Sequence, residues 1–74
     1  MIQNNIPFVS MYVNGQQITL QKELSINEFL EQERYDQRKI AVGKNGSIIP
    51  KKLFDTEMLC DNDTLEIVSL IGGG

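Results

Sequence analysis

The residues best suited to chemistry in this chain are its last three, Gly72, Gly73 and Gly74. They directly follow residues 64–71, an apolar and β-branched run that predicts a core strand. Glycine has no Cβ, so its backbone can enter narrow channels and adopt angles that other residues avoid. We therefore expect a thin, flexible arm whose working group is the terminal carboxylate of Gly74. The alternative is a frayed or linker-like tail, because chain ends are commonly disordered.

The rest of the sequence offers little catalytic chemistry. There is no histidine, which is the commonest general base and metal ligand. The single cysteine, Cys60, cannot form an internal disulfide or a zinc cluster, and its apolar neighbours predict a small buried hydrophobe. Gly43 and Gly46 lack the lysine–serine ending of a phosphate-binding loop. We predict that the chain is not an enzyme on its own, and that it has no metal site and no stably bound cofactor.

Length and charge narrow the class of protein further. The 74 residues allow one domain with a small core. Ten acidic against seven basic residues give a net charge of −3, and the basic doublets Arg38-Lys39 and Lys51-Lys52 form no stripe, so we expect no nucleic-acid partner. The net negative charge is consistent with a basic protein partner, but it also commonly serves only to keep a protein in solution. We expect no membrane contact and a cytoplasmic location, because there is neither a spanning apolar run nor a signal-peptide pattern.

The first half of the chain predicts a hairpin followed by a helix. Polar and apolar residues alternate over residues 9–13, the Asn14-Gly15 pair predicts a tight turn, and the alternation resumes beyond it. Ser25 and Glu28 have the spacing of a capping box, which predicts a helix from this point to about Tyr35.

The second half predicts three more strands. Residues 40–42 form a short apolar strand, and Asn45-Gly46 predicts a second tight turn into a strand that the next proline interrupts. A loop or single helical turn should follow, with Phe54 pointing inward. The aspartate-rich residues 61–63 predict a turn before the last strand, which should be central in the sheet.

This order of elements predicts the β-grasp (ubiquitin-like) fold. The fold class is α+β, a mixed sheet of four to five strands packed on one helix, with the last strand between the first and third and parallel to the first. Residues 1–10 are expected to be an N-terminal extension with the start of the first strand, residues 11–71 the β-grasp domain, and residues 72–74 the flexible arm.

Four features together resemble the ubiquitin-like sulfur carriers, and in particular the bacterial sulfur carriers of thiamine biosynthesis. They are the hairpin turn at Asn14-Gly15, the strand 40–42 with Asn45-Gly46, the turn at residues 61–63, and the terminal glycines. The resemblance covers about residues 11–74. The chain departs from the family in two places: Asn62 stands where glycine is usual, and residues 1–10 precede Met11, where the family normally begins.

The resemblance implies a chemistry for the arm. An adenylyltransferase related to ubiquitin-activating enzymes would use ATP to form an acyl-adenylate on Gly74. Persulfide sulfur from a cysteine desulfurase or similar donor would then displace AMP and leave a thiocarboxylate. Thiazole synthase would take that sulfur to build the thiazole ring. Gly73 and Gly74 would enter the partner's active site, with Gly72 as the hinge.

Alternation along the last strand predicts a docking surface for these partners. If Leu65 and Ile67 face the helix, the other side chains of the strand face outward, on the same side as Ala41. An exposed apolar patch of this kind often marks a protein interface. The predicted partner-binding residues are Ala41, Glu66, Val68, Leu70, Ile71, Gly72 and Gly73. The alternative is the reverse alternation, with Val68 and Leu70 packed inside.

Three other functions remain open from the sequence. The small subunit of molybdopterin synthase would share both the fold and the thiocarboxylate chemistry. A ubiquitin-like protein modifier would join Gly74 to lysines of target proteins. From a different class, a β-grasp interaction module would carry the glycines without any chemistry.

Overall fold

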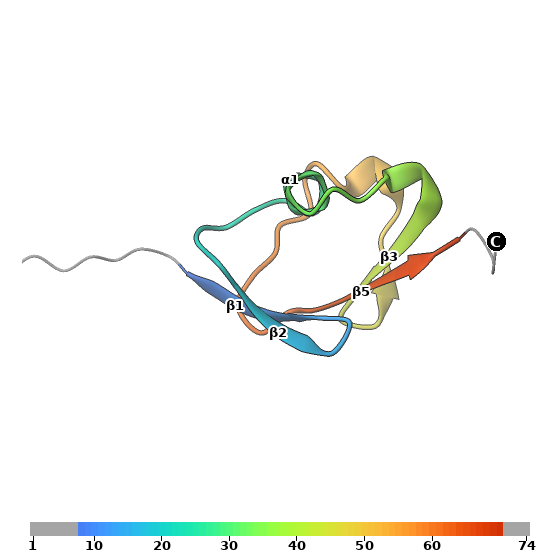
Figure 1. Ribbon diagram of the computed structural model, residues 1–74. Helices are drawn as coiled ribbons and strands as arrows, with labels where there is room; N and C mark the ends of the chain where they lie inside the picture. Colours follow the sequence, from blue (N-terminus) through green and yellow to red (C-terminus); the bar gives the residue numbers. More distant parts are fainter. Residues whose placement is uncertain (1–7, 71–74) are drawn as a thin grey trace, which may run out of the picture.

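The computed structural model describes residues 8–70, which form one mixed sheet covered by a single helix (Figure 1). The strands are β1 (Val9–Val13), β2 (Gln16–Leu20), β3 (Ile40–Lys44), β4 (Ser47–Ile48) and β5 (Thr64–Ser69). The helix is α1 (Ile26–Gln32), and two 3-10 turns, η1 (Gln37–Lys39) and η2 (Lys51–Leu53), complete the elements. Residues 1–7 and the predicted site residues Ile71, Gly72, Gly73 and Gly74 lie outside the described residues.

The sheet has the predicted topology. Its strand order is β2-β1-β5-β3-β4, so the last strand is central. β5 runs parallel to β1 and antiparallel to β3. β2 pairs with β1 and β4 pairs with β3, each in an antiparallel hairpin. The β-grasp prediction is therefore confirmed, with five strands.

Both predicted tight turns are present, and their backbone angles explain the residue types. The φ angles are 50° and 84° at Asn14 and Gly15, and 53° and 88° at Asn45 and Gly46. Two consecutive positive φ angles define the hairpin turn for which asparagine–glycine is the preferred pair. Asn62, in place of the usual glycine, likewise has a positive φ of 68°. Asparagine tolerates this left-handed region better than most residues.

The helix begins as predicted. The Ser25 hydroxyl accepts a hydrogen bond from the Glu28 amide at 3.0 Å, and the Glu28 carboxylate accepts one from the Ser25 amide at 2.9 Å. This reciprocal capping box satisfies two amides at the start of α1 that have no partner within the helix.

The predicted end of the helix at Tyr35 was wrong, because α1 ends at Gln32. Arg34 has a φ of 63°, and the chain closes with hydrogen bonds from Arg34 to the Glu31 carbonyl and from Tyr35 to the Leu30 carbonyl. Glycine usually occupies this left-handed position at a helix end. A residue with a side chain adopts this left-handed conformation at a cost of about 1 kcal/mol. Because arginine stands here instead of glycine, the sequence contains no indication that the helix ends.

The core lies between the sheet and α1. Ile26, Phe29 and Leu30 form the buried face of the helix, which packs with Met11, Val42 and Leu65 of the three central strands in one hydrophobic cluster. Phe54, just after η2, is 2% exposed and points inward as predicted. Within residues 8–70, no helix has the length and apolar character that crossing a membrane requires.

Candidate functional site

The predicted site begins where β5 leaves the sheet. Ser69 is paired with Ile40, and the amide of Leu70 donates a hydrogen bond to the carbonyl of Lys39 at 2.8 Å. Backbone bonds to β3 and to η1 thus hold the chain up to the last described residue. Since β5 is the central strand, whatever follows Leu70 starts from a fixed point on the rigid part of the fold.

Side chains of β5 alternate between the core and the outer face of the sheet. Leu65 and Ile67 face the helix and are 0% and 9% exposed. Val68 and Leu70 are each 57% exposed, and Glu66 is exposed beside them. The predicted orientation is confirmed, and the reverse alternation is wrong.

Strand register brings further apolar residues to the same outer face. Ala41, which is half-buried, pairs with Val68, and Gly43 pairs with both Glu66 of β5 and Ile48 of β4. A Cβ built on Gly43 would lie 4.0 Å from atoms of the Glu66 and Ile48 side chains, so all three positions share one face. We call this surface the outer patch; it consists of Ala41, Gly43, Ile48, Glu66, Val68 and Leu70.

Ile48 was not among the predicted site residues, although it is the most exposed large apolar residue described, at 74%. The asparagine–glycine turn could have predicted this exposure. A two-residue loop at Asn45-Gly46 places Lys44 opposite Ser47 and Gly43 opposite Ile48. Because β3 alternates, the same face that carries Ala41 must then carry Ile48.

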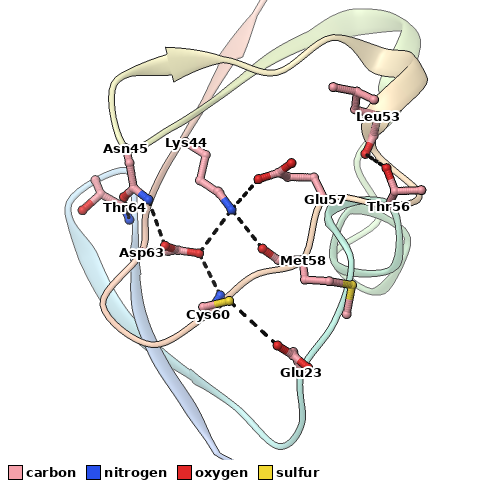
Figure 2. A network of polar contacts seen from close by, with 10 residues as sticks. All are labelled: Glu23, Lys44, Asn45, Leu53, Thr56, Glu57, Met58, Cys60, Asp63 and Thr64. Atoms are coloured by element: carbon pink, nitrogen blue, oxygen red, sulfur yellow. Dashed lines mark hydrogen bonds and ion pairs between the residues drawn. The ribbon is translucent and has the colours of Figure 1, made fainter.

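A partly buried lysine, Lys44, anchors the segment that precedes β5 (Figure 2). Lys44 points to the inner side of β3, where its Nζ lies 2.6 Å from a Glu57 carboxylate oxygen and 3.7 Å from an Asp63 oxygen. It also donates to the carbonyl of Met58 at 3.0 Å. Partial burial acts to lower the pKa of Lys44, but the hydrogen bond with Glu57 and the two negative charges outweigh it, so the pKa is raised. The amine therefore stays protonated.

Asp63 connects this network to the second hairpin (Figure 2). Its carboxylate accepts hydrogen bonds from the Cys60 amide at 2.7 Å and the Asn45 side chain at 2.9 Å. The Asn45 oxygen in turn accepts from the amide of Thr64, the first residue of β5. These bonds fix where β5 starts relative to the β3–β4 hairpin, and thereby the register that assembles the outer patch.

Loss of the Asp63 carboxylate should therefore destabilise the fold. We expect Asp63→Ala to lower the free energy of unfolding by about 2–4 kcal/mol, because a buried acceptor of several bonds is removed beside the partly buried amine of Lys44. Urea denaturation measures this. The control is Asp55→Ala, at an exposed aspartate, which should stay within about 0.5 kcal/mol of wild type. Equal stability of the two variants would contradict the anchoring role.

The prediction that Cys60 is buried was wrong, because its side chain is exposed. The extended segment alternates here, so Leu59 enters the core and the next side chain turns outward. The Cys60 sulfur lies 3.8 Å from a Glu23 oxygen. Partial desolvation and the negative charges of Asp63 and Glu23 raise the pKa of the thiol, which therefore stays protonated at neutral pH. Across residues 8–70, no group of three potential ligand side chains is placed to hold a metal ion.

Comparisons with known proteins agree with this geometry. The chain is 32% identical over all 74 residues to the uncharacterized protein ycf40 of Pyropia yezoensis, and covers all of that protein. It is 31% identical over 65 residues to the sulfur carrier protein ThiS of Bacillus subtilis, covering 86% of this chain and 98% of that one. It is also 33% identical over 66 residues to a thiazole synthase of Paramagnetospirillum magneticum, covering 89% of this chain but 20% of that protein.

A solved structure extends the likeness to three dimensions. The crystal structure of the thiamine biosynthesis protein ThiS from Geobacter metallireducens superposes with a TM-score of 0.78 at 28% identity, over 89% of this chain and 100% of that one. The model of the ThiS family matches residues 4–74, which include the whole described fold and the terminal glycines. The chain therefore belongs to the ThiS family, whose ubiquitin-like fold it shares.

Proposed function

We propose that this chain is the sulfur carrier of a thiamine pathway and acts as a protein co-substrate rather than as an enzyme. One observation carries the proposal: the family match runs through residue 74 and so includes the glycines that follow the central strand β5 in the sequence. Within this proposal the folded domain serves as the handle, and the carboxylate of Gly74 as the group that carries sulfur.

Activation of that carboxylate requires a partner. An α-carboxyl group has an ordinary pKa of about 3.5, so it is ionised and a poor electrophile at neutral pH. In our proposal an adenylyltransferase related to ubiquitin-activating enzymes lets a Gly74 oxygen attack the α-phosphorus of ATP, and pyrophosphate leaves. Persulfide sulfur from a cysteine desulfurase or similar donor then attacks the acyl carbon, and AMP leaves. A thiol cleaves the resulting S–S bond, which leaves a thiocarboxylate on Gly74.

Thiazole synthase is the proposed acceptor of the sulfur. A protein named thiazole synthase carries a segment similar to this chain within its own length. Joining a carrier-like segment and a synthase in one polypeptide keeps the two at high effective concentration, as expected for proteins that react with each other. We place these reactions in the cytoplasm.

The outer patch is the proposed docking surface for these partners. Ile48, Val68 and Leu70 are large apolar side chains that are each more than half exposed on one face. Burying such side chains is favourable, and interface centres are typically more apolar than the rim. The predicted contacts Ile71, Gly72 and Gly73 follow Leu70 directly in the sequence and precede Gly74, so we propose that a partner that binds the patch receives the arm in its active site.

Intact-mass measurement tests the proposal directly. After incubation with ATP, the cognate adenylyltransferase and a sulfur donor, we expect the chain to gain one sulfur in place of one oxygen. Omitting ATP is the control and should leave the mass unchanged. The rival functions give other outcomes: sulfur transfer only to molybdopterin synthase indicates its small subunit, isopeptide adducts indicate a protein modifier, and an unchanged mass in the complete mixture indicates an interaction module.

A further inference from the structure

The two basic doublets of the sequence lie on the two 3-10 turns of the fold. Arg38 and Lys39 belong to η1, and Lys51 and Lys52 belong to η2. All four residues are exposed. The doublets are separated by more than ten positions in the sequence and form no stripe there.

The fold brings the two turns together. The Gln37 side chain in η1 donates a hydrogen bond to the Asn27 side-chain oxygen. The amide of the same Asn27 donates to the carbonyl of Phe54, directly after η2, at 2.9 Å. One residue of α1 thus contacts both η1 and the residue that follows η2, and Figure 1 shows the two turns (green and light orange) near each other on the helix side of the sheet.

The same turns lie toward the end of the sheet where β5 ends. Lys39 accepts the hydrogen bond of the Leu70 amide at 2.8 Å, so η1 contacts the end of β5 directly. Ile49 donates to the Val42 carbonyl at 2.9 Å, so the chain runs back along β3 from β4 toward η2. We call Arg38, Lys39, Lys51 and Lys52 the basic collar; the backbone hydrogen bond between Lys39 and Leu70 joins it to one end of the outer patch.

The collar makes the charge distribution strongly uneven. Residues 36–39 and 51–55 hold four of the seven basic residues but only two of the ten acidic ones, so they carry a net +2 while the rest of the chain carries −5. Arg38 forms an ion pair with Asp36 at 3.0 Å. The cationic character of the collar therefore depends most on the three lysines.

We propose that the basic collar docks against an acidic surface that surrounds the arm-binding channel of the adenylyltransferase. This inference rests on the proposed function and adds the chemistry of the partner's surface. The segments that hold the collar carry a net +2 on a chain of net charge −3, so they are the part of this chain that an acidic surface attracts. The collar turns the arm-bearing end toward that partner, which speeds productive encounter. Charges at the rim around an apolar centre are the usual arrangement of a specific interface.

Charge reversal combined with a salt series tests the collar. The variants are Lys51→Glu and Lys52→Glu, singly and together. The matched control is Lys22→Glu, which makes the same charge change just after Leu20, at the opposite end of the sheet where β1 begins. We expect the double variant to lower kcat/KM for adenylation about tenfold at low ionic strength, with kcat and the KM for ATP unchanged. The difference should vanish near 0.5 M salt, where the Debye length is only a few ångströms. Lys22→Glu should change kcat/KM less than about twofold at any salt concentration.

The outcomes separate this inference from the function on which it rests. If wild-type chain is adenylated but the Lys51 and Lys52 variants match Lys22→Glu at low salt, the collar proposal is wrong and the carrier function stands. A raised KM for ATP in the Lys51 and Lys52 variants would show that the collar contacts the nucleotide instead of the partner's surface. That result would also overturn the collar proposal. If wild-type chain is not adenylated at all, the carrier function fails and the collar inference fails with it.

Discussion

A variant that lacks Gly73 and Gly74 should form no acyl-adenylate and pass no sulfur to thiazole synthase. Each residue spans at most about 3.5 Å, so the deletion withdraws the terminal carboxylate by about 7 Å. Attack on ATP needs the reacting atoms within about 3.5 Å, and even a 1 Å misplacement can cost about a hundredfold in rate. We therefore expect a loss well above about a hundredfold, measured by intact mass and by thiazole formation.

Two further variants show whether the reaction depends on the position of the terminal carboxylate or on the absence of side chains in the arm. Gly74→Ala keeps the carboxylate at its place but adds one Cβ to the arm, and should lower the rate less than the deletion does. A peptide tag after Gly74 leaves the glycines unchanged but replaces the carboxylate with an amide, and should abolish sulfur transfer completely. The deletion and the tag should leave the free energy of unfolding unchanged, because residues 8–70 form the described core. Thiazole formation by the deletion variant would refute the role of Gly74.

Much of this fold could be predicted because its signals are local. The two asparagine–glycine pairs set hairpin register within a few residues, and the Ser25–Glu28 capping box marks the start of the helix. Alternation left two orientations of β5 open, and the outward orientation of Val68 and Leu70 was predicted by assigning the more uniformly apolar face to the helix.

The predictions failed where the deciding contacts join distant parts of the chain or where an unusual residue fills a common role. Arg34 occupies a position that glycine usually marks, so the early end of the helix had no sequence signal. Cys60 turned outward because the neighbouring Leu59 entered the core. The basic collar depends on Asn27, whose side-chain oxygen accepts a hydrogen bond from Gln37 and whose amide donates one to Phe54, two residues that both lie further along the chain.

Leu70→Asp should lower kcat/KM for adenylation about 10- to 100-fold, equivalent to about 1.4–2.7 kcal/mol of lost transition-state binding. The leucine lies at the end of the outer patch nearest the arm and is 57% exposed. A charge there would have to be desolvated in an apolar contact, which is unfavourable. The matched control is Phe8→Asp, at an exposed apolar residue just before β1, whose start lies at the end of the sheet away from Leu70. Both variants should keep the unfolding midpoint of wild type, and equal adenylation kinetics would contradict the docking surface.

Salt dependence should distinguish this apolar contact from the collar beside it. Burial of an apolar side chain is only weakly sensitive to ionic strength, whereas attraction between exposed charges falls steeply within a Debye length. The defect of Leu70→Asp should therefore persist near 0.5 M salt, while that of the Lys51 and Lys52 variants disappears. Ile48→Asp, on β4 at the far side of the patch, should show the same salt-resistant behaviour with a smaller loss. A Leu70 defect that vanished with salt would mean that the added charge acts through the collar, and that the outer patch is not itself buried by the partner.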